Sequence, residues 1–371
     1  MAEIIFARSR PFTLGVELEF QILDRETLDL ASMAPAIMKK AQGRLAEKLA
    51  PEFLRSIIEV QTGICKSVDE AADDLRRTVY AAEHTAADCG CLLYSASLHP
   101  FAEPAGQMLS EGERYGRIMD ELQYVGRQFI SQGLHVHVGM ENGETAIVVC
   151  DTLQAYLPVM LGISTSSPYF RGEDTGLCSY RTKLFEALPL AGLAGFIGSW
   201  QGYQDEIAML KERQVVREPR DLWWDVRPSP GLGTVEIRTC DIPSRFQEIF
   251  GLTALLQALT AAIVDKRVRH APVSIQLLRC NKWQAVRHGL AGRFNDPLGL
   301  LPTATQTIRG AAGQMLEVLE PYMHTFGAGH WADSVQHVLD YGTSTKRQRQ
   351  LVSEGATFKE MILQIRSEYW T

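Results

Sequence analysis

Five short segments of the chain alternate apolar and polar residues with a period of two, the pattern of a β-strand whose two faces differ in chemistry. These segments are residues 13–20, 57–62, 93–99, 133–139 and 233–240. In the first of them, Glu17 and Glu19 share one face, whereas Leu18 and Phe20 share the other. The ionisable residues of every segment fall on the polar face. The pattern therefore predicts a sheet with one polar face and one apolar face that is covered by helices.

Apolar residues recur every three to four positions in 67–89, 111–130, 246–264 and much of 333–370, which is typical of helices with one apolar face. The strands are not followed by evenly spaced crossover helices, and one-sided alternation is typical of antiparallel pairing. We therefore predict an α+β fold with a mainly antiparallel sheet. Because no linker-like stretch divides the chain, we expect one catalytic domain over residues 1–371, mainly helical from about residue 246.

The composition narrows the class of protein. With 46% hydrophobic and 22% charged residues the chain can form a large core, and its net charge of -7 comes without a basic block, so nucleic acid is not an expected partner. The uncharged stretches 152–170 and 187–204 contain Pro and several polar residues, which indicates buried segments of a soluble core and no membrane partner. The first residues lack a secretory signal pattern, and the seven cysteines form no C-x-x-C, so we expect reduced thiols and a cytoplasmic location.

Two carboxylates lie side by side on the first predicted strand, in the segment GVELEF. Glu17 and Glu19 are two residues apart, which places them roughly 7 Å apart along one face. Carboxylates this close repel each other unless a cation or a proton lies between them, and their hard oxygen atoms suit Mg²⁺ or Mn²⁺. The alternative is a solvent-facing pair on an edge strand.

Two imidazoles share one face of the strand GLHVHVG. His135 and His137 are flanked by Gly133 and Gly139, which leave room for a ligand to approach. Such a pair could bind zinc, as in a metal-dependent hydrolase, or contact a phosphate group. The alternative is a pair of structural histidines in a polar network.

A third element spans residues 221–241 and carries two arginines close to a glutamate. Arg227 precedes a Pro-bounded loop, and Glu236 and Arg238 share the polar face of the next strand. Arginine forks commonly hold carboxylate or phosphate groups. An E-x-R pair on a strand can equally be a cross-strand ion pair.

The segment 164–185 is rich in Ser, Gly and Thr and is interpreted as a loop. Its charged and hydroxyl groups predict a site for an anionic substrate, unless the loop is simply a solvated surface. The candidate substrate-binding residues are Arg171, Asp174, Tyr180 and Arg181.

Together these elements favour phosphoryl transfer. Acids and arginines that recur on one face of separate strands can hold metal ions and offset the charge of a moving phosphoryl group. The sequence contains no G-x-x-x-x-G-K-[ST], no G-x-G-x-x-G and no G-x-S-x-G, so a nucleotide must be held in another way and a serine nucleophile is not indicated.

Four motifs carry a resemblance to a known family: PFTLGVELEF, GLHVHVG, SSPYFRGEDTGLCSYR and DLWWDVRPSPGLGTVEIRTCDIP. In order and approximate spacing they resemble those of bacterial carboxylate-amine ligases classed as glutamate-cysteine ligase type 2, over nearly the whole chain. The resemblance implies a curved antiparallel sheet similar to the catalytic domain of glutamine synthetase, with ATP and divalent metal ions on its concave face. It also implies a homo-oligomer, namely a dimer.

The resemblance implies a role for each candidate residue. The metal ligands are expected to be Glu17, Glu19, Glu59, His137 and Glu236. Arg227, Glu236 and Arg238 are expected to be catalytic. ATP is expected to contact His135, His137, Arg227 and Arg238. The run IIEVQTG departs from the E-L-A-T form of the family at Val60 and Gln61, so either Glu59 or Gln61 completes the metal site.

The implied reaction activates a carboxylate, by family analogy the γ-carboxylate of glutamate, through attack on the γ-phosphate of ATP. An amine, such as that of cysteine, then displaces phosphate from the acyl phosphate. Positioning and electrostatics are the contribution expected from the protein. A hydrolase with zinc at His135 and His137, and a binding protein that holds ATP without turnover, are the alternative functions.

Overall fold

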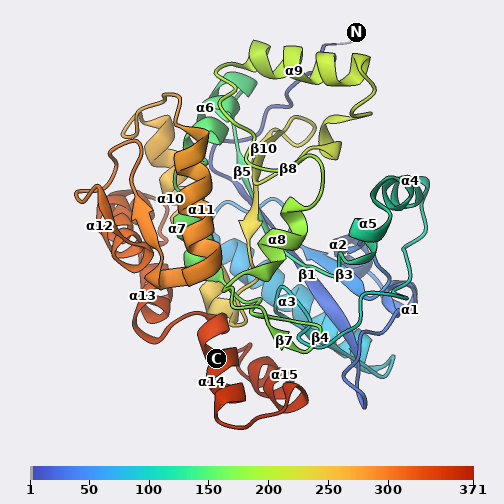
Figure 1. The fold of residues 1–371 in the computed structure, drawn as a ribbon. Coiled ribbons are helices and arrows are strands. Elements are labelled where there is room, and N and C mark those ends of the chain that lie inside the picture. The colour runs from blue at the N-terminus through green and yellow to red at the C-terminus, as the bar shows by residue number, and fades with distance from the viewer. Residues whose placement is uncertain (1–2) are drawn as a thin grey trace.

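A computed structural model describes residues 3–371 and contains a central seven-stranded sheet (Figure 1). Its strands are β1 (Leu14–Asp24), β2 (Leu49–Pro51), β3 (Ile57–Gln61), β4 (Cys91–Tyr94), β5 (Leu134–Gly139), β10 (Val226–Ser229) and β11 (Thr234–Cys240). The order along the sheet is β10, β11, β5, β1, β3, β2, and β4 pairs with the last part of β1. Every pairing in this sheet is antiparallel, which confirms the predicted mode of pairing.

Three pairs of short strands lie outside the central sheet. They are β6 (Tyr169–Phe170) with β7 (Glu173–Asp174), β8 (Ala191–Gly192) with β9 (Trp223–Trp224), and β12 (Arg293–Asn295) with β13 (Thr305–Thr307). Only the pair of β8 and β9, among the strand pairs of residues 3–371, is parallel.

Helices make up most of the remaining chain, and the part after residue 246 is mainly helical, as expected. Before that point lie α1 (Ala34–Lys40), α2 (Arg44–Lys48), α3 (Val68–Ala87), α4 (Glu113–Leu122), α5 (Tyr124–Arg127), α6 (Gly143–Leu153), α7 (Leu157–Ser164), α8 (Tyr180–Glu186) and α9 (Trp200–Glu212). After it lie α10 (Phe246–Val264), α11 (Ile275–His288), α12 (Ile308–Thr325), α13 (Ala332–Tyr341), α14 (Ser344–Ser353) and α15 (Phe358–Ser367). Single 3₁₀ turns are formed by Pro219–Asp221, Gly289–Ala291 and Gly329–Trp331.

Two of the predicted helices agree with the structure and one is divided. α10 has the predicted bounds, and α3 begins after Ser67, whose hydroxyl accepts a hydrogen bond from the backbone N–H of Glu70 at 3.1 Å. The continuous helix predicted for 111–130 is wrong. Gln123 has a φ of 49°, outside the helical region, and it separates α4 from α5.

One predicted strand is too long at its C-terminal end. β4 stops at Tyr94, and the backbone of 95–99 makes a single isolated bridge, between Leu98 and Ser131, in place of a strand ladder. The N–H of Ser97 donates to the hydroxyl of Ser166, and the imidazole of His99 accepts hydrogen bonds from the N–H groups of residues 101 and 102. The strand predicted over 95–99 is therefore wrong.

The apolar face of the sheet is buried under α3, α6, α7 and α10, whose apolar side chains form one cluster with those of the strands. On β1, Leu14, Val16 and Leu18 belong to this cluster and are at most 1% exposed. Burial of one such side chain stabilises the fold by roughly 1.5–3 kcal/mol, and a register slip of one residue would expose the whole set. The packing therefore turns the alternate side chains, including Glu17 and Glu19, to the polar face. The curvature of the sheet stays a prediction.

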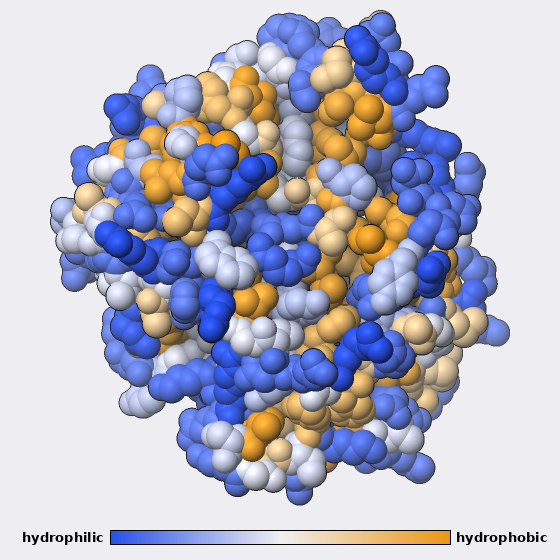
Figure 2. Space-filling view, viewed as in Figure 1, coloured by the Kyte–Doolittle hydropathy of each residue, from blue (hydrophilic) through white to orange (hydrophobic). Residues whose placement is uncertain are grey.

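The long apolar segments lie mostly inside the protein. Within residues 3–371, α10 is the one helix that is long and apolar enough to cross a membrane, and 89% of that stretch is buried; α6 and α7 pass the same test only as a pair bent by 64°. On the face drawn in Figure 2, apolar residues form separate patches among polar ones. Residues 152–169 are buried, as predicted, and Phe170 at the end of this stretch is partly exposed. The burial predicted for 187–204 is wrong, because most of these residues are partly exposed.

Candidate active site

The register of the sheet brings the predicted polar residues next to one another. Glu17 lies opposite His135 on one side and Gln61 on the other, and Glu19 lies opposite Glu59. Farther along, Glu236 lies between His137 and Arg227. Directly opposed residues in antiparallel strands have Cβ atoms about 4.5–5.5 Å apart, so groups distant in the sequence become a single polar surface.

This surface forms the floor of a cavity of about 560 Å³. The predicted residues that line it are Glu17, Glu19, Glu59, His135, His137, Arg181, Arg227, Glu236 and Arg238. The other walls come from α4, α8 and the segment that begins with the 3₁₀ turn Pro219–Asp221. Glu59 lines the cavity, whereas the neighbouring candidate Gln61 does not.

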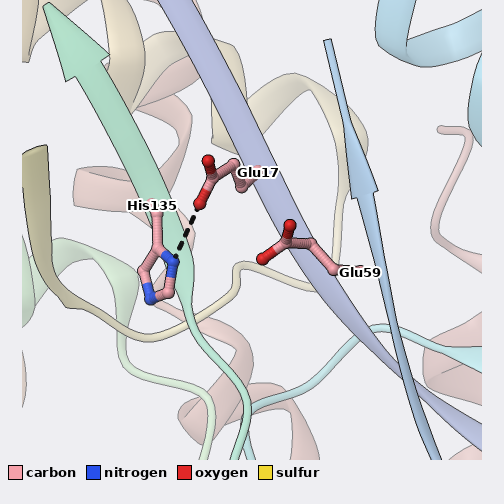
Figure 3. Close-up of side chains that lie close together, drawn as sticks. All are labelled: Glu17, Glu59 and His135. Carbon is pink, nitrogen blue, oxygen red and sulfur yellow. Dashed lines mark hydrogen bonds and ion pairs between the residues drawn. The ribbon is translucent and has the colours of Figure 1, made fainter. Parts of the chain in front are cut away.

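Glu17 stands between the two histidines. His135 Nδ1 is 3.3 Å from one of its carboxylate oxygens, and His137 Nε2 is 3.2 Å from the other (Figure 3 shows the first contact). Burial opposes ionisation of Glu17, but the hydrogen bonds and the electrostatic attraction of His135 and His137 together outweigh it and lower its pKa. For His135, burial and the charge of Arg238 lower the pKa to about 4, so the neutral imidazole dominates at neutral pH.

Three carboxylates gather where β1, β2 and β3 meet, and we call Glu19, Glu52 and Glu59 the acidic end. Their oxygen atoms can approach within 4.8 Å of one another. Burial, together with the charge of Glu52, raises the pKa of Glu19 to about 8. Burial and then the charges of Glu17, Glu52 and Glu19 raise the pKa of Glu59 well above its usual value. The acidic end therefore binds protons unless a cation offsets its charge.

Glu236 lies on the same face of the sheet, toward β10, and faces positive charges instead of carboxylates. We call Arg227, Glu236 and Arg238 the arginine end. Arg227 donates from Nε to one carboxylate oxygen at 2.8 Å and from Nη2 to the other at 3.2 Å, and Arg238 Nη1 donates to the same group. Burial opposes ionisation, but the charges of Arg238 and Arg227 hold the pKa of Glu236 well below its usual value. The cross-strand ion pair that the sequence allowed is thus present.

The donor atoms of the cavity fit a divalent metal ion. Besides the acidic end, two other groups bring their donor atoms within 4.8 Å of one another, and all ligands are carboxylate oxygens or imidazole nitrogens. These groups are Glu17 with Glu59 and His135, and Glu17 with His137 and Glu236. His137 also contacts the hydroxyl of Thr234 through Nδ1 at 2.8 Å, which leaves Nε2 facing Glu17. Oxygen-rich ligand sets of this kind suit Mg²⁺ or Mn²⁺ better than zinc.

Comparison with known proteins identifies the family. Residues 13–354 match the model of the family described as glutamate-cysteine ligase family 2 (GCS2). The chain belongs to this family. The ligase predicted from the sequence motifs is therefore confirmed, and the hydrolase alternative is not favoured.

Similar proteins match this chain over nearly its whole length. A protein of Gloeobacter violaceus named "Putative glutamate--cysteine ligase 2" is 34% identical and covers 97% of both chains. One of the same name from Herpetosiphon aurantiacus is 32% identical over 96% of this chain and 92% of its own. Glutamate–cysteine ligase of Francisella tularensis, solved in complex with AMP, shares the fold with a TM-score of 0.69 at 11% identity, over 98% of this chain and 90% of that one.

The segment interpreted as a loop does not reach the cavity as a whole. Its last residues form α8, so Tyr180 and Arg181 lie on a helix, and of the four candidate residues in this segment only Arg181 lines the cavity. Asp174 instead forms an ion pair with Arg349 at 2.6 Å, and Arg171 pairs with Glu103 at 3.0 Å. These two charges are thus used at the surface, away from the sheet.

Several residues that line the cavity were not predicted from the sequence. Glu52 follows the short strand β2, where no alternation marks it, and Arg114 and Tyr115 come from the helical α4. The hydroxyl of Tyr115 donates to the carbonyl of Pro51 at 2.9 Å, which joins α4 to β2 beside Glu52. The signal that could have found Glu52 is the short sequence distance to Glu59, since neighbouring strands joined by a short connection commonly pair.

Proposed function

We propose that this protein is an ATP- and magnesium-dependent ligase that joins a carboxylate to an amine in the cavity on the polar face of the sheet. A carboxylate oxygen attacks the γ-phosphorus of ATP, ADP leaves, and an acyl phosphate forms. The amine nitrogen then attacks the acyl carbon, loses a proton, and phosphate leaves. One observation carries the proposal: three overlapping groups of metal-ligand type lie next to two arginines along one sheet face.

Four carboxylates and one imidazole of the sheet are the proposed metal ligands: Glu17, Glu19, Glu59, Glu236 and His137. The raised pKa values of Glu19 and Glu59 support this role, because a divalent cation would replace the proton that these buried groups otherwise bind. Glu52 completes the acidic end and is proposed as a further ligand. When bound, Mg²⁺ would offset the charge of phosphate oxygens during the transfer; Mn²⁺ could take its place.

The arginine end is proposed to contact the phosphates of ATP or the acyl substrate. Arg227 is held by the carbonyl groups of Arg220 and Leu222 at 3.0 and 2.8 Å, so its guanidinium cannot rotate freely. Arg238 has its Nε buried without a hydrogen-bond partner in the described structure, and its side chain lines the cavity. A guanidinium fixed before the reaction stabilises developing charge without reorganising. Glu236, between the two arginines, is the proposed third catalytic residue, and His135 and His137 are proposed to contact ATP.

The substrates, partners and domain organisation belong to the proposal. The names of the relatives favour the γ-carboxylate of glutamate and the amine of cysteine, and the AMP bound to the Francisella ligase supports an adenine nucleotide. We propose one catalytic domain over residues 1–371 that forms a homodimer in the cytoplasm and acts on small molecules only. Whether Arg171, Asp174 and Tyr180 contribute to substrate binding stays a prediction.

Phosphate release tests the proposed function. Purified protein is mixed with ATP, Mg²⁺ and pairs of carboxylates and amines, with glutamate and cysteine as the first pair. Phosphate that appears only when both substrates are present supports the ligase. ATP binding without phosphate release for any pair would favour the binding protein, and chelator-sensitive hydrolysis without ATP would favour the zinc hydrolase.

A further inference from the structure

Strand β11 carries a bulge at the position of Arg238. Ile237 pairs with Val136 and Cys240 pairs with Leu134, so the β11 side of this interval holds one residue more than the β5 side. The extra residue returns Cys240 to the apolar face, where it is buried in the core. A bulge also removes regular ladder partners from the backbone groups within it.

The side chain of Arg181 binds the carbonyl groups of the bulge. Its Nη1 donates to the carbonyl of Thr239 at 3.2 Å, and its Nη2 donates to the carbonyl of Arg238 at 3.1 Å. In a regular strand, successive carbonyls point to opposite sides, so one planar guanidinium could not reach both. The bulge and Arg181 therefore depend on each other: the bulge turns both carbonyls to one side, and the guanidinium satisfies them.

Arg181 is itself fixed by its surroundings and is only 3% exposed. A Cβ atom at Gly133 would lie 2.2 Å from its Nη2, so only glycine leaves space for the guanidinium there. Behind it, the backbone N–H of Arg181 donates to the hydroxyl of Ser167 at 3.2 Å, and that hydroxyl donates to the buried Asp241 at 2.7 Å. The hydroxyl of Ser167 and the carboxylate of Asp241 thus link the start of α8 to the residue that follows β11.

We propose that Arg181 is a positioning residue for Arg238: by holding both carbonyls of the bulge, it sets the direction in which the Arg238 side chain meets Glu236 and the cavity. The remaining backbone anchor of Arg238 is its N–H, which donates to the carbonyl of Asp225 at 2.8 Å. This inference rests on the proposed function in that Arg238 acts on the reaction. It assigns Arg181 an effect through Arg238 and not through the substrate.

A double-mutant cycle in the full-length protein tests the proposal. Arg181→Lys keeps the charge but loses the planar fork that donates to both carbonyls at once. We expect its kcat to fall at least about tenfold, with the KM for each substrate changed by less than about twofold. In the Arg238→Lys background, Arg181→Lys should lower kcat by less than about twofold further, because the group that it positions is already altered.

Arg347→Lys is the matched control. Arg347 is another arginine with a largely buried side chain, and it binds Glu248, Ser244 and the carbonyl of Gly342 outside the cavity. This control should melt lower with kcat unchanged. Arg181→Lys would overturn the proposal if it behaved in the same way. Multiplicative losses with Arg238→Lys, together with a raised KM, would also overturn it, since they indicate direct substrate contact. Arg181→Gln serves if Arg181→Lys does not fold, and failure of both to fold would assign Arg181 a purely structural role.

Hydrogen exchange separates this inference from the proposed function. If the wild-type protein releases no phosphate from any substrate pair, the proposed function fails, and exchange of backbone amides alone decides the role of Arg181. Faster exchange in residues 236–241 of Arg181→Lys than in Arg347→Lys supports the proposal. Equal exchange in this segment would overturn it.

Discussion

The two ends of the cavity floor hold the same side chain in opposite electrostatic settings. At the acidic end, burial raises the pKa of Glu19 and Glu59, and their nearest charged neighbours include other carboxylates. At the arginine end, Glu236 is equally buried, yet Arg238 and Arg227 lower its pKa. Burial therefore acts alike at both ends, and the sign of the shift is set by the charges that face each carboxylate.

The two ends therefore differ in whether they need a bound cation. The charge of the carboxylate at the arginine end is offset within the chain, whereas the charges at the acidic end are not. At the arginine end, two guanidinium groups of the chain already pair with the one carboxylate, so this end can be rigid before any substrate arrives. The acidic end has carboxylates in excess and gains most from a divalent cation. A metal ion is thus expected to change the acidic end most, because the charge of Glu236 at the arginine end is already offset by Arg227 and Arg238.

The largest effect is expected from Glu19→Gln, which removes a charge from the acidic end with almost no change of shape. Turnover should fall by at least about ten-thousandfold, or more than about 5 kcal/mol, because a proposed ligand of the metal ion that offsets phosphate charge is lost. The protein should remain folded and its melting temperature should not fall. Phosphate release and thermal melts measure both, with the exposed Glu317→Gln on α12 as the control. A folded Glu19→Gln enzyme with normal turnover would exclude the metal-ligand role.

The second effect is a pH dependence of the metal-free protein. The pKa of Glu19 is raised from 4.5 to about 8, so the folded state binds its proton more tightly than the unfolded state. Stability from this group is complete below pH 4.5 and is lost as the pH rises to about 8, by at most about 5 kcal/mol. Urea unfolding at several pH values, with a chelator present, measures the loss. Glu19→Gln should reduce the slope, and an identical slope in this variant would assign it to other groups.

The third effect concerns the arginine end. Arg238→Lys keeps the charge but loses the planar fork, so kcat should fall about a hundredfold, which corresponds to about 3 kcal/mol. The variant should remain folded and still bind ATP. If Arg238 served only its ion pair with Glu236, the variant would melt lower and keep its turnover per molecule. Melting temperature and kcat of the same preparation distinguish the two results.

The smallest effect is stabilisation by ligands. ATP with Mg²⁺ at about one hundred times its Kd should stabilise the protein by about 2.7 kcal/mol. ATP alone would add negative charge beside the acidic end and should stabilise much less. Thermal melts with ATP, with Mg²⁺ and with both test this. Equal stabilisation by ATP in the presence of a chelator would argue against a metal site at the acidic end.

The alternation of polar and apolar residues predicted much of the sheet, because one face of each strand is buried and the other faces the cavity. Four of the five predicted strands begin within one residue of their observed starts, and α10 matches its predicted bounds. The pattern failed where side chains bind the backbone, as after Tyr94, and where a positive φ interrupts a helix, as at Gln123. Neither feature changes the hydrophobic period.

The floor of the cavity could be predicted from the sequence, but its walls could not. Glu17, Glu236 and Arg238 follow from the parity of their strands. Glu52 and Arg114 come from a strand edge and a helix that reach the cavity through tertiary packing, which leaves no local pattern. Arg181 was predicted as a substrate ligand from a segment interpreted as a loop, and its two hydrogen bonds to the bulge could not be foreseen because bulges have no clear sequence signal.

The strand order has a consequence for how the protein is made. β1 is synthesised early, yet its partner β5 emerges more than one hundred residues later, and β11 later still: Glu17 and His135 are 118 positions apart. Synthesis proceeds from the N-terminus at about 5–20 residues per second, so β1 waits for several seconds with an unpaired edge. Long-range strand pairing is slow, and an open edge is prone to aggregation. Chaperones that hold nascent chains should therefore matter for this protein until Cys240 has left the ribosome.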